Sequence, residues 1–146
     1  MTQTLSELAV AVVIVLLTIS EGALKSLLVR NSGGRWALPS GAVEPREPLR
    51  QAAERVIREQ VGVKVDYLEQ LYTFGNEVPR KGQRKVQVAY YGLIPSVLLR
   101  TEQLADSQLA RWFAPAEQPR LFGEDSLILR VATDRLRGKL SYTAVG

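Results

Sequence analysis

The sequence predicts an α/β domain, in which strands alternate with two helices. Three observations lead to this fold class. The run from Leu8 to Leu17 is rich in Val and Ile, whereas residues 48–61 and 125–136 repeat their apolar side chains at helical spacing. The apolar run is too short to cross a bilayer, and its composition is typical of a strand that is buried on both faces. The chain of 146 residues has the length of a single domain.

The expected strands follow one another in a simple order along the chain. A turn at residues 20–22 would join the first strand to an antiparallel partner, and the glycines at residues 33–34 mark the loop that follows. A short extended segment precedes Pro39, because proline disfavours helix at the residue before it. The predicted strands are residues 8–19, 23–30, 36–38, 65–74, 85–94 and 108–113.

The clearest predicted element is the helix at residues 48–61. Pro48 suits the first turn of a helix, and Gly62 is typical of the residue that ends one. The apolar side chains of this helix lie on one face, and they are Leu49, Ala52, Ala53, Val56 and Ile57. A second helix is predicted at residues 125–136, and its apolar side consists of Leu127, Ile128, Val131 and Leu136.

The composition restricts the chemistry that the domain can perform. The chain contains no Cys and no His, which excludes disulfides and argues against zinc and copper sites. Any metal would be a hard ion held by carboxylates and carbonyls. A cysteine-free chain fits a cytoplasmic location, and no basic residue precedes the apolar run, as a secretory signal would require. The net charge of +4 is compatible with a polyanionic ligand but does not define one.

Residues 41–63 carry the most informative motif. Its nine specified positions keep the spacing of the Nudix box, which it resembles, and seven of them match: Gly41, Glu47, Arg55, Ile57, Glu59, Gly62 and Val63. The resemblance implies the Nudix fold, an α/β/α sandwich around a mixed β-sheet, formed by residues 1–146 as one domain. It also implies that Glu47 and Arg55 form the ion pair that braces loop against helix. Gly41 and Gly62 are expected to serve as a turn and a helix stop.

The metal-binding face of this motif departs from the family. Helix positions i, i+3 and i+4 share a face, and the family places three glutamates there to bind divalent ions. Here the three residues are Val56, Glu59 and Gln60. The resemblance implies Glu59 as the catalytic carboxylate, and Glu59, Gln60 and the carbonyl of Gly41 as metal ligands. One carboxylate, one amide and one carbonyl form a poor site for Mg²⁺ or Mn²⁺, so we expect weak metal binding and weak or absent hydrolysis.

Segments outside the box resemble one particular branch of the Nudix family. Residues 67–75, 88–94 and 111–113 look like the Nudix branch that contains ADP-ribose pyrophosphatases and Nudix-related transcriptional regulators of NAD metabolism. Residues 125–146 resemble the segment that leads into a winged-helix domain in those regulators. The resemblance implies a sensor domain for an ADP-ribose-like nucleotide and a homodimer, without membrane contact. Since no winged helix fits before Gly146, DNA contact is expected only through such a domain outside this chain.

Three residues near the box are candidates for ligand contacts. Arg30 and Arg35 flank the approach to the box, and guanidinium groups bind phosphates bidentately. Trp36 is the third candidate, and an adenine could lie against Trp36, Tyr72 or Phe74. Each of these residues has a simpler alternative as part of the core or the surface, and packing in the apolar stripe of its helix is the corresponding alternative for Val56.

Two other functions remain open beside a nucleotide-binding module. An active Mg²⁺-dependent hydrolase would combine Glu59 with a carboxylate from a loop, and the available ones are Glu77, Glu102 and Asp106. Direct nucleic-acid binding would rely on two basic clusters: Arg80, Lys81, Arg84 and Lys85, and Arg130, Arg135, Arg137 and Lys139. Such clusters are more often solvated surface, and neither belongs to a motif that reads a DNA groove.

Overall fold

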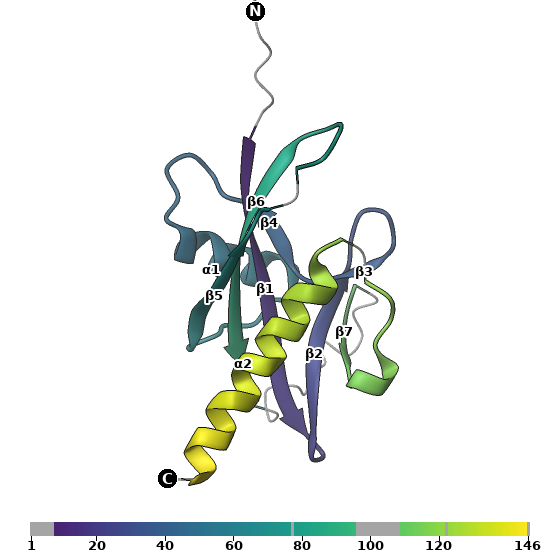
Figure 1. Ribbon diagram of the computed structural model, residues 1–146, viewed down its shortest axis with the longest axis vertical. Coiled ribbons are helices and arrows are strands. Elements are labelled where there is room, and N and C mark those ends of the chain that lie inside the picture. Colours follow the sequence, from purple (N-terminus) through teal and green to yellow (C-terminus); the bar gives the residue numbers. More distant parts are fainter. Residues whose placement is uncertain (1–7, 77, 96–108, 122, 146) are drawn as a thin grey trace, which may run out of the picture.

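The computed structural model describes residues 8–76, 78–95, 109–121 and 123–145, and their side chains up to residue 140. Within these ranges the chain forms a seven-stranded sheet and two α-helices (Figure 1). The strands are β1 Leu8–Ser20, β2 Ala23–Arg30, β3 Trp36–Ala37, β4 Ser40–Ala42, β5 Leu68–Phe74, β6 Arg84–Leu93 and β7 Ala110–Phe113. The helices are α1 Leu49–Gln60 and α2 Asp125–Val145, and a short 3-10 helix, η2, lies at Pro115–Glu117.

Strand β1 lies at the centre of the sheet. It runs parallel to β6, from the pair Leu8–Arg84 to the pair Leu17–Leu93, and antiparallel to β2 and β4. The strand order is β3-β2-β1-β6-β5, with β4 beside β1 and β7 beside β2. Helix α1 packs on one face of this mixed sheet, and α2 crosses the other face diagonally (Figure 1). The predicted sandwich of helix, mixed sheet and helix is therefore confirmed.

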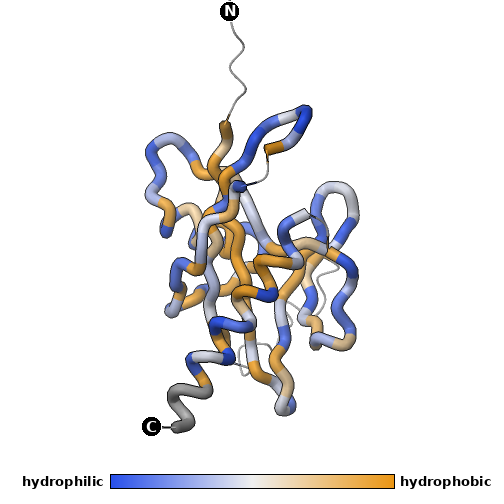
Figure 2. Tube along the Cα trace, in the orientation of Figure 1, coloured by the Kyte–Doolittle hydropathy of each residue, from blue (hydrophilic) through white to orange (hydrophobic). Residues whose placement is uncertain are grey.

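The apolar run in β1 serves both cores of the sandwich. All residues from Ala11 to Leu17 are at most 7% exposed. The side chains of Val12, Ile14 and Leu16 pack on the α1 side, and those of Val13, Val15 and Leu17 pack on the α2 side. Figure 2 shows this hydrophobic centre as a continuous run through the sheet. The prediction of a strand buried on both faces is confirmed, because every second side chain enters a different core.

Several predicted boundaries differ from the structure. Strand β4 was not predicted, because its three residues are too few to show an alternating pattern. Helix α2 was predicted to end at residue 136, but it continues through Gly138 to Val145. Strand β5 begins three residues later than predicted, and the predicted start of the last strand, Gln108, lies outside the described residues. The extension of α2 is the largest difference, and side-chain contacts with the sheet account for it.

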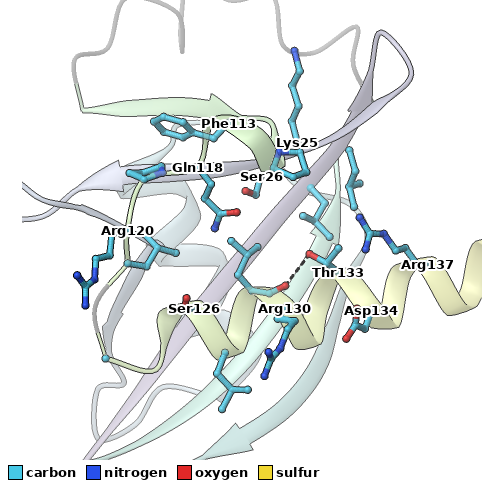
Figure 3. Close-up of a pocket in the computed structure, with 18 residues that line it drawn as sticks. Lys25, Ser26, Phe113, Gln118, Arg120, Ser126, Arg130, Thr133, Asp134 and Arg137 are labelled. Atoms are coloured by element: carbon cyan, nitrogen blue, oxygen red, sulfur yellow. Dashed lines mark hydrogen bonds between the residues drawn. The ribbon is translucent and has the colours of Figure 1, made fainter.

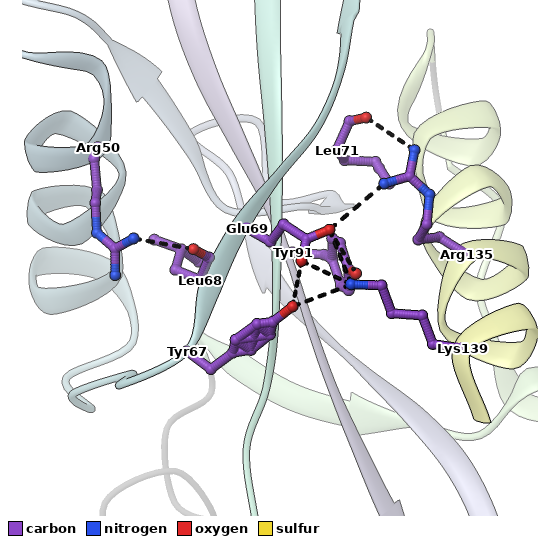
Figure 4. A network of polar contacts seen from close by, with 8 residues as sticks. All are labelled: Arg50, Tyr67, Leu68, Glu69, Leu71, Tyr91, Arg135 and Lys139. Atoms are coloured by element: carbon purple, nitrogen blue, oxygen red, sulfur yellow. Dashed lines mark hydrogen bonds and ion pairs between the residues drawn. The ribbon is translucent and has the colours of Figure 1, made fainter. Parts of the chain in front are cut away.

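A polar network joins the second half of α2 to strands β5 and β6 (Figure 4). The ammonium group of Lys139 donates to both carboxylate oxygens of Glu69, at 2.7 and 3.0 Å, and to the hydroxyl of Tyr67. The guanidinium of Arg135 donates to the carbonyl of Leu71 at 3.2 Å. The Tyr67 and Tyr91 hydroxyls also donate to Glu69. The hydrogen bonds to Glu69, of which that from Lys139 has the largest effect, hold the pKa of Glu69 below its usual range. Together with the bond from Arg135 to Leu71, they anchor the helix beyond Gly138.

The substitution Glu69→Gln tests this anchoring. It removes the ion pairs with α2, so we expect the thermal midpoint at neutral pH to fall by about 2–4 °C. The lowered pKa of Glu69 sets the sign of the pH dependence. Its contribution is complete above the ordinary glutamate pKa of about 4.3 and is lost as pH falls through the lowered value.

The measurement is a series of circular dichroism melts from neutral pH into acid. Wild type and Glu69→Gln should converge as the pH falls. Glu54→Gln is the matched control, because Glu54 pairs with Arg50 at 3.4 Å on the solvent side of α1. A gap between Glu69→Gln and wild type that stays constant with pH would contradict the role assigned to the carboxylate.

Candidate functional site

Helix α1 presents the motif of residues 41–63 to the rest of the domain. Its buried side chains are Ala52, Ala53, Val56 and Ile57. The helix ends at Gln60, and Gly62 follows with a left-handed φ of 83° and donates its amide to the carbonyl of Ile57 at 2.9 Å. Such a backbone conformation favours glycine, so the expected helix stop is confirmed.

The loop before α1 is tied to the helix by Glu47 and Arg55. Arg55 Nε donates to one carboxylate oxygen of Glu47 at 2.7 Å and Nη2 to the other at 2.9 Å. The same guanidinium donates to the carbonyl of Ala42 at 2.8 Å and pairs with Glu59 at 3.2 Å. The hydrogen bonds from Arg55 hold the pKa of Glu47 below its usual range, and Glu47 raises the pKa of Arg55. One arginine thus fixes strand, loop and helix together.

Gly41 lies in strand β4, opposite Val12, and not in the turn that the sequence suggested. The reason for glycine at this position is close packing. A Cβ atom on Gly41 would lie 2.8 Å from the Cγ2 atom of Val56, which is only 1% exposed. Val56 therefore packs against the backbone of β4, and its side chain belongs to the core on the α1 side.

The substitution Gly41→Ala tests this contact. We expect it to lower the free energy of unfolding by about 1–3 kcal/mol, because the added methyl group overlaps a β-branched side chain that cannot move away. The double variant with Val56→Ala should lose less than the sum of the two single changes, since the smaller side chain makes room. Gly138→Ala is the matched control, because nothing lies within 4 Å of a Cβ atom there. Urea unfolding of wild type, the two single variants, the double variant and the control measures these losses, and strict additivity of the two changes would contradict the contact.

The two polar residues of the expected metal face have different surroundings. The side chain of Glu59 is 57% exposed and pairs with Arg55. The amide of Gln60 donates to the carbonyl of Ser40 at 2.7 Å, so it connects the end of α1 to β4. Over the described ranges, no group of three or more acidic side chains could hold a metal ion. The loop carboxylates Glu77, Glu102 and Asp106 lie outside those ranges.

A cleft of about 690 Å³ opens beside this end of the box. It is lined by all three predicted ligand residues, Arg30, Arg35 and Trp36. The box adds Ser40 and Gln60 to the same wall. The structure thus brings the predicted phosphate contacts and the polar end of α1 into one cavity, although 20 positions separate Ser40 from Gln60. Glu59 and the carbonyl-bearing Gly41 are not among the lining residues.

The cleft also contains residues that the sequence did not indicate. Lys85 and Gln87 reach it from β6, and Asp125 reaches it from the start of α2. The carboxylate of Asp125 accepts a hydrogen bond from the amide of Leu38 at 3.1 Å. Burial raises the pKa of Asp125, against smaller opposing effects of Leu38 and Lys85. No local pattern identifies these side chains, because pairing of distant strands brings them to the cleft.

The aromatic wall of the cleft is already in contact with arginine. The Arg30 guanidinium carbon lies 4.3 Å from the ring centre of Trp36, and Arg30 also donates to the carbonyl of Gly34 at 2.8 Å. The ring of Trp36 meets Phe113 edge-on at 5.1 Å. A base that stacks on Trp36 would share this ring with Arg30, or displace it.

Tyr72 and Phe74 do not line the cleft. They pack edge-on against each other in β5, with ring centres 5.2 Å apart. Tyr72 is 58% exposed, whereas Phe74 is buried in the core on the α2 side. Their suggested contact with an adenine is therefore wrong for this cleft, because β5 lies at the opposite edge of the sheet from β3.

The fold and the box geometry are those of a Nudix domain. Residues 7–131 match the family model described as NUDIX domain, and the chain belongs to the Nudix family. It is 31% identical, over 88% of its length, to the "ADPR responsive transcriptional repressor NtrR" of Acinetobacter baylyi. It spans about half of that relative, 54% of its length.

Two solved structures lead to the same branch of the family. The NUDIX domain of Shewanella oneidensis NrtR, in a complex with ADP ribose, is 29% identical, with a TM-score of 0.74 and 88% of each chain covered. NrtR of the same organism is 31% identical, with a TM-score of 0.80 over 90% of this chain and 64% of that one. The predicted relation to ADP-ribose-responsive Nudix regulators is confirmed. Among the described residues, no helix is both long enough and apolar enough to cross a membrane.

Proposed function

We propose that this domain binds an ADP-ribose-like nucleotide in the cleft between β2, β3, the end of α1 and the start of α2, and that it acts as a sensor rather than as an efficient hydrolase. The single observation that carries the proposal is the convergence of Arg30, Arg35 and Trp36 with Gln60 in one cavity. Arginine suits a diphosphate, and an indole ring suits a base or a ribose. The related NrtR domain that was crystallised with ADP ribose supports this ligand class.

The weak hydrolysis follows from the donor atoms that the box retains. Mg²⁺ and Mn²⁺ require several converging oxygen ligands, preferably carboxylates. Glu59 supplies the one carboxylate of the metal face, and it is engaged by Arg55. Gln60 supplies an amide that already bonds Ser40, and Val56 supplies no donor and is buried. These residues do not fit a magnesium centre, so we assign no catalytic step to a metal. In the alternative of an active hydrolase, Glu59 would be the catalytic residue, and Glu59, Gln60 and the carbonyl of Gly41 would be the metal ligands.

A regulatory role is part of the same proposal. A domain that recognises a nucleotide without consuming it can report its concentration through a change of shape or assembly. We further propose a cytoplasmic homodimer, with any DNA contact made through a separate winged-helix domain. The DNA contact is supported by NrtR of Shewanella oneidensis, which was crystallised with a 27mer DNA. The homodimer is proposed from the family resemblance, and the cytoplasmic location from the lack of cysteine.

Calorimetry with ADP-ribose tests the binding proposal. Arg30→Ala should weaken binding about ten- to a hundredfold, because it removes charge-assisted hydrogen bonds to a phosphate. Arg46→Ala is the control, because Arg46 is exposed and does not line the cleft. Absence of binding by the wild type, or equal loss in both variants, would refute the assignment of the cleft.

An assay of ADP-ribose hydrolysis distinguishes a sensor domain from an active hydrolase. Incubation with ADP-ribose and Mn²⁺ should release little AMP, and Glu59→Gln should change this little. Rapid release that Glu59→Gln abolishes would establish the domain as an active hydrolase.

A further inference from the structure

A second groove lies along α2, and it shares no lining residue with the nucleotide cleft. It has a volume of about 690 Å³ and is bounded by α2, by the start of β2, by the end of β7 and by residues 115–121 and 123 (Figure 3). Its apolar lining is formed by Leu17, Leu24, Phe113, Leu121, Leu127 and Leu129. Leu24 and Leu127 are accessible there, whereas the other four are at most 9% exposed and form the floor. The groove is therefore a separate surface, with an apolar floor and two accessible leucines.

Basic residues dominate the rim of this groove. Lys25, Arg120, Arg130 and Arg137 line it, and Asp134 is the one acidic residue beside them. In the part of the chain that the structure describes, none of the four cations makes an ion pair. Arg135 and Lys139, on another side of the same helix, are engaged by Glu69. The groove side of α2 thus keeps positive charge for a partner.

The groove side of α2 has a regular pattern. Ser126, Arg130, Thr133 and Arg137 follow one another at steps of four, three and four residues, which is the spacing of one helix face. Arg130 and Arg137 are two turns apart, or about 10.5 Å along the axis. Acidic residues seven positions apart on a second helix have the same separation. A helix that lies along α2 could therefore meet both arginines while its apolar face covers the groove.

The positions of the cations argue against a small anion as the ligand of this groove, and the burial of its aromatic ring argues against nucleic acid. Figure 3 shows Arg120 and Arg137 at opposite ends of the groove, so the cations do not converge on one phosphate. Phe113 is only 9% exposed, so the aromatic ring of the groove offers no open face to a base. A basic rim around an apolar interior complements an acidic amphipathic helix.

We propose that the α2 groove is a docking site for an acidic amphipathic helix of a partner protein. Leucine-type anchors enter the apolar interior, and carboxylates seven residues apart pair with Arg130 and Arg137. The docking site shares no lining residue with the nucleotide cleft, so a docked helix and a nucleotide would not occupy the same space.

The probe that tests the proposal is a fluorescent synthetic helix with leucines on one face and glutamates seven residues apart at its edge. Fluorescence anisotropy should detect binding, and Arg130→Glu combined with Arg137→Glu should weaken it at least about tenfold. Arg80→Glu combined with Lys81→Glu is the matched control. It changes the net charge equally at exposed residues of the segment between β5 and β6, and it should leave binding unchanged.

Two further measurements locate the binding. Because the chain has no cysteine, Ser126→Cys introduces a unique thiol at the groove, and the peptide should slow its labelling by a maleimide. A matched peptide with lysine in place of glutamate should not bind. Equal binding of both peptides, equal affinity of the two charge-reversed variants, or an unprotected thiol would overturn the proposal. So would tighter binding of a DNA oligonucleotide, or a self-association that Arg130→Glu and Arg137→Glu abolish, since these outcomes identify a nucleic acid or a second copy as the occupant.

Discussion

Replacement of Val56 by glutamate is expected to lower the free energy of unfolding by about 3 kcal/mol at neutral pH in metal-free buffer. Val56 is 1% exposed and packs against Gly41, which has no Cβ atom. A carboxylate there would lose its hydration without gaining a cationic partner, so its pKa would rise. The destabilisation should therefore be small in acid and grow as the pH rises through the shifted pKa.

Divalent ions should reverse this loss when the neighbouring donor is also restored. In the variant that combines Val56→Glu with Gln60→Glu, three carboxylates would share one face of α1 together with Glu59. Mn²⁺ would then bind the folded protein and raise the thermal midpoint, because a ligand of the native state stabilises it. Release of AMP from ADP-ribose by this variant, absent in the wild type, would show that the cleft and the restored metal face are compatible.

The matched control is Val56→Gln, which introduces a similar volume without charge. It should be destabilised at all pH values and should not respond to Mn²⁺. Equal stabilisation of both variants by the metal would contradict the assignment of residues 56, 59 and 60 to one metal face. Thermal melts with and without Mn²⁺ measure both outcomes.

Replacement of Arg55 by alanine is expected to lower the thermal midpoint by on the order of 5 °C. The change removes hydrogen bonds to Glu47, Glu59 and the carbonyl of Ala42 at once. It also leaves the Glu47 carboxylate without its main cation. Because Arg55 holds the pKa of Glu47 low, the part of the wild-type advantage that comes from Glu47 should be complete above about pH 4.3 and be lost as the pH falls further, whereas the bond to the carbonyl of Ala42 persists.

Arg58→Ala serves as the control for this prediction. Arg58 lies one turn further along the same helix and is exposed. Its removal changes the charge of α1 equally, so it should leave the midpoint nearly unchanged. If both variants lose the same stability, net charge and not the contacts of Arg55 would be the cause.

Local sequence patterns were sufficient to predict the elements whose conformation depends mainly on their own residues. Helix α1 was predictable because its apolar residues repeat at helical spacing and Gly62 provides a left-handed stop. Strand β1 was predictable because its consecutive apolar residues from Ala11 to Leu17 are rich in Val and Ile, which is typical of a strand buried on both faces. Gly41 was predicted to form a turn but lies in β4, because the contact with Val56 that requires glycine depends on how β4 packs on α1.

The remaining features depend on contacts between distant segments. Lys85 and Gln87 enter the cleft beside the box because β6 pairs with β1, and nothing near them in the sequence signals that position. Helix α2 passes Gly138 because Lys139 bonds Glu69, which is 70 positions away. In β5, a bulge between Gln70 and Tyr72 interrupts the alternation of the strand and leaves Tyr72 exposed. A sequence analysis that assumes strict alternation of inward and outward side chains could not predict this bulge.

The parallel pairing of β1 with β6 has a consequence for the order of events during synthesis. Thr18 of β1 and Ile94, which are joined by a buried hydrogen bond of 2.6 Å, are 76 positions apart. The ribosome therefore releases the most apolar segment of the chain long before the strand that covers one of its edges. We expect chaperones to protect the nascent β1 strand during this interval. Folding should also be slow for a domain of this size, because its central contacts close such a long loop.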